Sequence, residues 1–193
     1  MTLILCPGVH SAQLTQSFLN EMAPVCGDSV VFPTECYLAY SPWQLTQFLE
    51  TTLNHTQLHQ PAIFIGFSAG VVAAIATAWW WQFNGRSVKA LIALDGWGVP
   101  LRGSFPIHRM SHDRFTHWSS TLGESLEDCF YADPAIEHLD LWRSPSSAYG
   151  QWIRPTSEGS LLEDVSLGSA PRSSSAQITA AHFLRMLLQR YRS

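Results

Sequence analysis

Ser68 is the central residue of the segment GFSAG, which fits the pattern G-x-S-x-G. A serine held in this pattern can act as a nucleophile, because a sharp turn exposes its hydroxyl to a neighbouring base. The pentapeptide alone arises easily by chance, so the flanking segments decide whether it indicates a nucleophile. The apolar run AIFI at 62–65 precedes it, and good helix formers follow over 69–83. This strand, turn and helix order is the one that the chemistry requires.

The residues beside Ser68 each have a role in such a turn. Side chains at Gly66 and Gly70 would collide with the neighbouring strand and helix, so we expect both positions to need glycine. The backbone N–H of Ala69 is free at the start of the helix, with the positive end of the helix dipole behind it. An oxyanion formed by attack of Ser68 would be stabilised there.

With this motif the sequence resembles the α/β-hydrolase superfamily, and the resemblance extends over most of the chain up to about Leu141. In that superfamily a second oxyanion donor follows an early strand, often next to His-Gly or Pro-Gly. The segment LCPGVHS matches that place, which makes the backbone N–H of Val9 or His10 the candidate. His10 is alternatively an ordinary loop histidine.

The resemblance also implies the order nucleophile, acid, histidine. Asp113, in FPIHRMSHDRFTHW, is then the first candidate for the acid, and His138, in CFYADPAIEHLDLW, is the candidate base. Some members of the superfamily carry the acid one strand earlier. Asp95 in IALDGWG is therefore the alternative acid, because it ends a strand at the edge where ligands gather in open α/β sheets.

Other histidines compete with His138, which lacks the glycine that usually precedes the base in this superfamily. The alternative bases are His112, His117 and His182. Three histidines and an aspartate fall within HRMSHDRFTH, but the pattern H-E-x-x-H is missing, so no metal site is expected. Neither a Walker-type phosphate loop nor G-x-G-x-x-G occurs, and no cofactor is expected.

These residues together predict a serine hydrolase that cleaves a carboxylic ester or thioester through an acyl-enzyme on Ser68. The histidine would remove the serine proton, and the aspartate would hold the histidine in the required tautomer. The alternative is a non-catalytic binding or scaffold protein with the same fold. Such a protein would use an exposed tryptophan edge, for which the run AWWWQF at 78–83 is the candidate.

Composition restricts the partners to a small molecule. The chain has 193 residues, 46% of them hydrophobic, and 15 acidic against 11 basic residues give a net charge of −4. This balance is not typical of a protein that binds nucleic acid or an anionic membrane. The first residues, MTLILCPGVH, are too short and too uncharged for a signal peptide or membrane span. Four cysteines without a C-x-x-C pair indicate reduced thiols, and we expect a cytoplasmic protein.

The order of elements predicts how these residues are positioned. Short apolar runs alternate with amphipathic segments, which favours one α/β domain over residues 1–193, a three-layer α/β/α sandwich with about six mainly parallel strands. The strand candidates are 3–6, 29–32, 62–65, 88–94, FPIHRM at 105–110 and CFYAD at 129–133. Helices are expected after Ser11, Ser41 and Ser175, and the stretch 155–175 reads as a flexible surface loop. The segment 96–105 is too short for a helical lid over the site.

Overall fold

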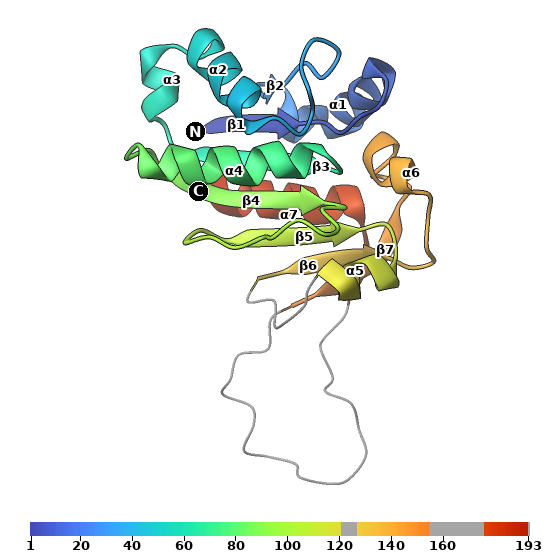
Figure 1. Cartoon of the computed structure of the whole chain (residues 1–193). Helices are drawn as coiled ribbons and strands as arrows, with labels where there is room; N and C mark the ends of the chain where they lie inside the picture. The colour runs from blue at the N-terminus through green and yellow to red at the C-terminus, as the bar shows by residue number, and fades with distance from the viewer. Residues whose placement is uncertain (121–126, 155–175, 193) are drawn as a thin grey trace, which may run out of the picture.

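The computed structural model of the chain describes residues 1–120, 127–154 and 176–192. Strands and helices alternate through most of it (Figure 1). The strands are β1 (Thr2–Cys6), β2 (Val30–Val31), β3 (Ala62–Phe67), β4 (Val88–Leu94), β5 (Ile107–Ser111), β6 (Cys129–Ala132), β7 (Tyr149–Ile153) and β8 (Ala176–Thr179). The helices are α1 (Ala12–Cys26), α2 (Pro42–Thr52), α3 (His55–His59), α4 (Gly70–Phe83), α5 (Arg114–Ser120), α6 (His138–Arg143) and α7 (Ala180–Arg192).

All eight strands form one sheet in the order β2-β1-β3-β4-β5-β6-β7-β8. The strands from β2 to β6 pair in parallel, whereas β7 and β8 are antiparallel additions at one edge. The predicted α/β class with a mainly parallel sheet is confirmed. The predicted number of about six strands is wrong, because it omitted β7 and β8.

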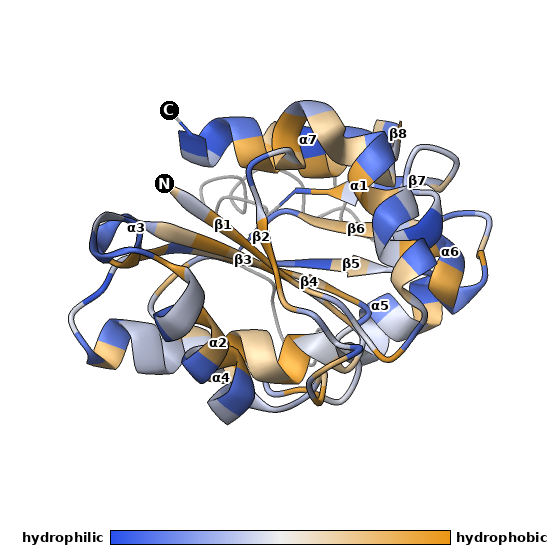
Figure 2. Cartoon of the chain, turned by 90° about the horizontal axis from the view of Figure 1, so that it is seen from above, coloured by the Kyte–Doolittle hydropathy of each residue, from blue (hydrophilic) through white to orange (hydrophobic). Residues whose placement is uncertain are grey.

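Helices cover both faces of the sheet (Figure 2). Alternate residues of a strand point to opposite faces, so β1 contributes to two separate hydrophobic clusters. Leu3 and Leu5 pack in the cluster that includes α1, α6 and α7. Ile4 and Cys6 pack in the cluster that includes α2 and α4. Burial on both faces explains why the inner strands are continuous apolar runs.

Local signals explain where the predicted helices begin. The Ser41 hydroxyl accepts a hydrogen bond from the Gln44 N–H at 3.3 Å, and Pro42 occupies the first turn of α2. Ser11 precedes α1 as predicted, although its side chain makes no capping hydrogen bond. None of the helices in the described ranges is long and apolar enough to cross a membrane.

The C-terminal part differs most from the sequence prediction. Ser175 lies outside the described residues, and β8 follows it instead of a helix, so that α7 begins only at Ala180. The two missed strands carry weak signals. Strand β7 contains Gly150, and β8 is only partly buried at the sheet edge. The predicted loop at 155–175 also lies outside the described residues.

Candidate active site

The candidate site lies at the topological switch point of the sheet, where successive strands are added on opposite sides of β1. Strand β1 pairs with β2 on one side and with β3 on the other. The segments that leave the carboxyl ends of β1 and β3 lead to helices α1 and α4, which cover opposite faces of the sheet. Such a divergence leaves a crevice at the carboxyl edge, and ligands bind there in open α/β sheets. Ser68 directly follows β3 at this edge.

Ser68 has the backbone conformation of a sharp turn, with φ of +53°. A side chain at positive φ is strained, and its surroundings must hold it there. The Ser68 N–H donates to Leu94 O at 2.9 Å, and Ser68 O accepts from the Val71 N–H at 3.0 Å. Both glycine expectations are confirmed. A Cβ at Gly66 would lie 2.8 Å from Val71 Cα, and a Cβ at Gly70 would lie 2.0 Å from Cys6 O.

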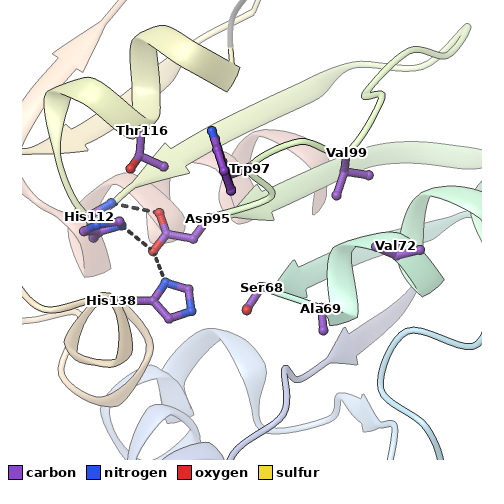
Figure 3. Close-up of a pocket in the computed structure, with 9 residues that line it drawn as sticks. All are labelled: Ser68, Ala69, Val72, Asp95, Trp97, Val99, His112, Thr116 and His138. Carbon is purple, nitrogen blue, oxygen red and sulfur yellow. Dashed lines mark hydrogen bonds and ion pairs between the residues drawn. The ribbon is translucent and has the colours of Figure 1, made fainter.

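Asp95 ends the neighbouring strand β4 and also has positive φ, +51°. Its side chain is 2% exposed, and it accepts three hydrogen bonds. Oδ2 accepts from His138 Nδ1 at 2.8 Å and from His112 Nδ1 at 3.0 Å, whereas Oδ1 accepts from the His112 backbone N–H at 2.9 Å (Figure 3). A carboxylate can only accept, so each Nδ1 carries a proton. This leaves Nε2 of His138 available for a second partner.

His138 is held by stacking as well as by Asp95. It is the first residue of α6, and its ring stacks on Phe67 at 4.8 Å. Phe67 stacks in turn on Trp142 at 5.2 Å, which anchors α6 to the sheet. The Ser68 hydroxyl points toward the His138 ring across the cavity (Figure 3). No hydrogen bond joins that hydroxyl to another of the residues drawn in Figure 3. Catalytic contacts of this kind often tighten only when substrate binds.

Asp113, the first candidate for the acid, is not the carboxylate that the structure places beside His138. Its Oδ1 accepts from the Thr116 N–H at 2.6 Å at the start of α5, and its Oδ2 lies 3.4 Å from His112 Nε2. Partial burial raises the pKa of Asp113, but hydrogen bonds from Thr116 and the nearby His112 outweigh that effect and hold the pKa below its usual value. The alternative acid, Asp95, occupies the position beside His138.

The three alternative bases lie in different surroundings. His112 faces Asp95 with one ring nitrogen and Asp113 with the other. His117 packs against the ring of Tyr131 at 5.3 Å, and burial lowers its pKa to about 4. His182 is exposed on α7. Of these three, only His112 lines the cavity that holds Ser68 and His138.

The backbone donors proposed for an oxyanion lie close to Ser68. A Cβ placed on Gly8 would be 3.0 Å from Ser68 Cβ, so the chain after β1 passes directly beside the serine. In the part of the chain that the structure describes, the N–H groups of Val9, His10 and Ala69 donate no hydrogen bond. The His10 ring instead packs on Phe67 at 5.7 Å. These free amides can donate to a developing negative charge.

A cavity of about 400 Å³ opens beside these groups. Nine residues line it: Ser68, Ala69, Val72, Asp95, Trp97, Val99, His112, Thr116 and His138 (Figure 3). It therefore combines a nucleophile, a carboxylate–histidine pair and an apolar wall. This volume is at the lower end of the range for small-molecule sites.

Among the described residues, Asp95, His112 and His138 are also a group that could hold a metal ion. One ligand atom from each lies within 4.8 Å of the others. Two imidazoles and one carboxylate are a donor set that transition metals accept. The distances of 2.8 and 3.0 Å from Asp95 Oδ2 to the two Nδ1 atoms equally fit hydrogen bonds that already satisfy these groups.

Sequence reasoning did not pair His112 with Asp95, although a signal for the pairing exists. Asp95 and His112 closely follow the predicted strands 88–94 and 105–110, and the carboxyl ends of neighbouring parallel strands meet at one edge of the sheet. The positions of Trp97, Val99 and Thr116 around the cavity carry no comparable signal, because they lie in irregular or loosely predicted segments. The sequence matches no protein-family model and no curated protein sequence.

Proposed function

We propose that this protein is a serine hydrolase of the α/β-hydrolase type, which cleaves a carboxylic ester or thioester through an acyl-enzyme on Ser68. The observation that carries the proposal is the hydrogen bond of 2.8 Å between His138 Nδ1 and the buried Asp95, at the edge where Ser68 stands in a positive-φ turn. A buried carboxylate that orients a histidine toward a strained serine is the arrangement of a catalytic triad.

The first half of the reaction transfers the acyl group to the enzyme. The Ser68 hydroxyl oxygen attacks the carbonyl carbon, and its proton passes to His138 Nε2. The negative charge that forms on the carbonyl oxygen is received by the free N–H groups of Ala69 and of Val9 or His10. The bond to the leaving group then breaks, and His138 Nε2 returns the proton to the departing oxygen or sulfur atom.

The second half releases the acid. A water molecule gives a proton to His138 Nε2 and attacks the acyl carbon, and the bond to Ser68 Oγ then breaks as the proton returns to the serine. Asp95 stays ionised throughout and stabilises the imidazolium that forms twice in the cycle. Asp95 therefore acts by fixing the tautomer and orientation of His138.

The arrangement of elements also supports this assignment. Helices on both faces of a mainly parallel sheet correspond to a three-layer α/β/α sandwich, and the serine follows β3, beside the switch point. Strands β4 and β5 are joined by residues 95–106, which contain no helix. Without a helical lid in this connection, part of a bulky or extended substrate can remain in solvent.

Metal-dependent hydrolysis is a second candidate, which the close approach of Asp95, His112 and His138 favours. A bound divalent metal would polarise a carbonyl or activate water, and Ser68 would then be dispensable. The two candidates differ in what they require. One needs the serine hydroxyl, and the other needs the metal.

Labelling with a fluorophosphonate probe separates these candidates. We expect the folded wild-type protein to form an adduct on Ser68, located by peptide mass spectrometry, and Ser68→Ala to lose both the adduct and ester hydrolysis. Hydrolysis that persists in Ser68→Ala and disappears with a chelator would instead support the metal candidate. A folded protein that neither reacts with the probe nor hydrolyses esters would be a non-catalytic binding or scaffold protein.

A further inference from the structure

The cavity has two chemically different halves. All its titratable side chains, Asp95, His112 and His138, lie on one side of Ser68, and Val72 and Val99 lie on the other side (Figure 3). Trp97 stands over the space between the halves, with 66% of its surface exposed. The half away from His138 thus offers methyl groups, with the Trp97 indole at its border, and no charged side chain among the described residues that line it.

The direction in which a substrate must lie follows from the proton transfer. The leaving-group atom receives its proton from His138 Nε2, so it has to lie on the histidine side of the serine. The acyl substituent is attached to the same carbonyl carbon and extends to the opposite side. It therefore points toward Val72 and Val99.

We infer that the acyl part of the substrate is an uncharged aliphatic chain of short to medium length, held between Val72, Val99 and Trp97. This inference rests on the proposed function. A carboxylate or ammonium group on the acyl chain would lose water in this half of the cavity and gain no counter-charge from the described residues that line it, which is costly. An aliphatic chain gains free energy there in proportion to its buried surface.

The size and shape of the cavity set the length. A volume of about 400 Å³ includes the space for the reacting carbonyl and the leaving-group atom, so the acyl half is only part of it. Val72 is the third residue of α4, and it is fixed by a helix that packs closely on the sheet. The Val72 side of the acyl half is therefore held by a helix, and long chains have to pass Trp97 into solvent.

The test compares p-nitrophenyl esters of acetate, butyrate, hexanoate and palmitate, and the charged hemisuccinate ester. We expect kcat/KM to rise at least about 10-fold from acetate to hexanoate, because one methylene in a hydrophobic pocket is worth about 10-fold or more. It should rise no further for palmitate, because the outer part of that chain stays in solvent. The hemisuccinate, with as many acyl carbons as the butyrate, should be at least about 10-fold worse than the butyrate. Adduct formation on Ser68 with the fluorophosphonate probe is measured on every protein used.

Two variants test whether the acyl chain of the substrate binds between these residues. Val72→Phe fills the acyl half, and Trp97→Ala removes its cover, so each should lower the hexanoate-to-acetate ratio of kcat/KM about 10-fold. Trp43→Ala is the matched control, because Trp43 is 76% exposed on α2 and does not line the cavity. It should leave both the ratio and the rates as in the wild type.

The failures of the two proposals are distinguishable. Three results would show that the aliphatic acyl site is wrong while the hydrolase stands, provided that Ser68 is labelled. The first is a kcat/KM that differs little between acetate and hexanoate, and the second is an equal kcat/KM for hemisuccinate and butyrate. The third is a change of kcat/KM by the same factor for acetate and hexanoate in both variants. If Ser68 is not labelled in any folded protein, the hydrolase and the acyl site are both wrong.

Discussion

Two residues of the candidate site, Ser68 and Asp95, have positive φ, and they are the only non-glycine residues to do so in the described part of the chain. Each follows a parallel strand and donates its N–H to the next strand, to Leu94 O and Met110 O. The left-handed conformation costs about 1–2 kcal/mol at a residue with a side chain. Strain that the surrounding structure enforces at adjacent strand ends is typical of functional sites.

The identity of the acid is testable at the level of single residues. We expect Asp95→Asn to lower kcat for an ester about 10³-fold or more, because an amide in this place no longer fixes the tautomer of His138. Asp113→Asn should stay within about threefold of the wild type, since Asp113 bonds to the start of α5 and approaches the site only through His112, 3.4 Å from its Oδ2. Initial rates at saturating substrate measure both effects.

The two asparagine variants are matched in chemistry and differ only in position, so each is the control for the other. Circular dichroism spectra that match the wild type would exclude unfolding as the cause of a loss. A larger loss in Asp113→Asn than in Asp95→Asn would contradict the assignment of Asp95.

Among the elements, α4 is the one whose position matters most for the serine. Its first residue, Gly70, packs directly on the end of β1, where a Cβ would lie 2.0 Å from Cys6 O and 2.5 Å from Pro7 O. Both neighbouring atoms belong to the backbone and cannot rotate away. The close contact brings the segment with Gly8 and Val9 next to Ser68, and so it places the free amides at the site.

Gly70→Ala tests this contact between elements. We expect it to reduce the free energy of unfolding by about 3 kcal/mol, because the methyl group overpacks a contact between two backbones. The measurement is a urea denaturation curve. Gly27→Ala is the matched control. Its Cβ meets only Ala23 O at 3.1 Å, and its φ of −56° suits alanine. An equal effect of both substitutions would contradict the close packing of α4 on β1.

At the scale of the whole molecule, α7 is tied to the sheet by a polar network around His108. His108 Nδ1 lies 2.9 Å from Asp128 O, and Nε2 lies 2.7 Å from the Tyr191 hydroxyl. A carbonyl accepts only, so Nδ1 donates, and in a neutral ring Nε2 then accepts from the Tyr191 hydroxyl. Burial lowers the pKa of His108, and burial also raises the pKa of Tyr191 to about 12. The network is therefore built for a neutral imidazole.

This network predicts how stability depends on pH. The unfolded chain takes up a proton on this histidine near pH 6.5, whereas the folded chain does so only at lower pH. The contribution of neutral His108 is fully present above pH 6.5 and is lost as the pH falls below it, by at most about 1.4 kcal/mol per pH unit. His117, whose pKa is lowered to about 4, acts in the same direction.

His108→Asn should therefore flatten the decline in unfolding free energy between pH 7.5 and about 5, measured by urea denaturation at each pH. Asparagine retains an N–H that can donate to Asp128 O and does not titrate. His59→Asn, on an exposed position of α3, is the matched control and should keep the slope of the wild type. A slope unchanged in His108→Asn would contradict the neutral network.

The elements that could be predicted are those with strong local signals. The strand, turn and helix around Ser68 depend on a buried apolar run, on glycines and on helix formers that are contiguous in the chain, so the sequence suffices to predict them. Strands β7 and β8 could not be predicted in this way. Gly150 weakens the pattern of one, and the other is a short, half-exposed edge whose pairing comes from the rest of the sheet.

The sequence by itself determined the place and conformation of Ser68, because a strained turn between a strand and a helix is a local property. Only the tertiary structure decided its partners. Asp95 and Asp113 both follow strands and are equally suited by chemistry. The register of β4 on β5 places Asp95 beside His138, whereas Asp113 bonds to the start of α5. His138 and Asp95 are 43 positions apart in the sequence, and they meet only because α6 packs on the sheet.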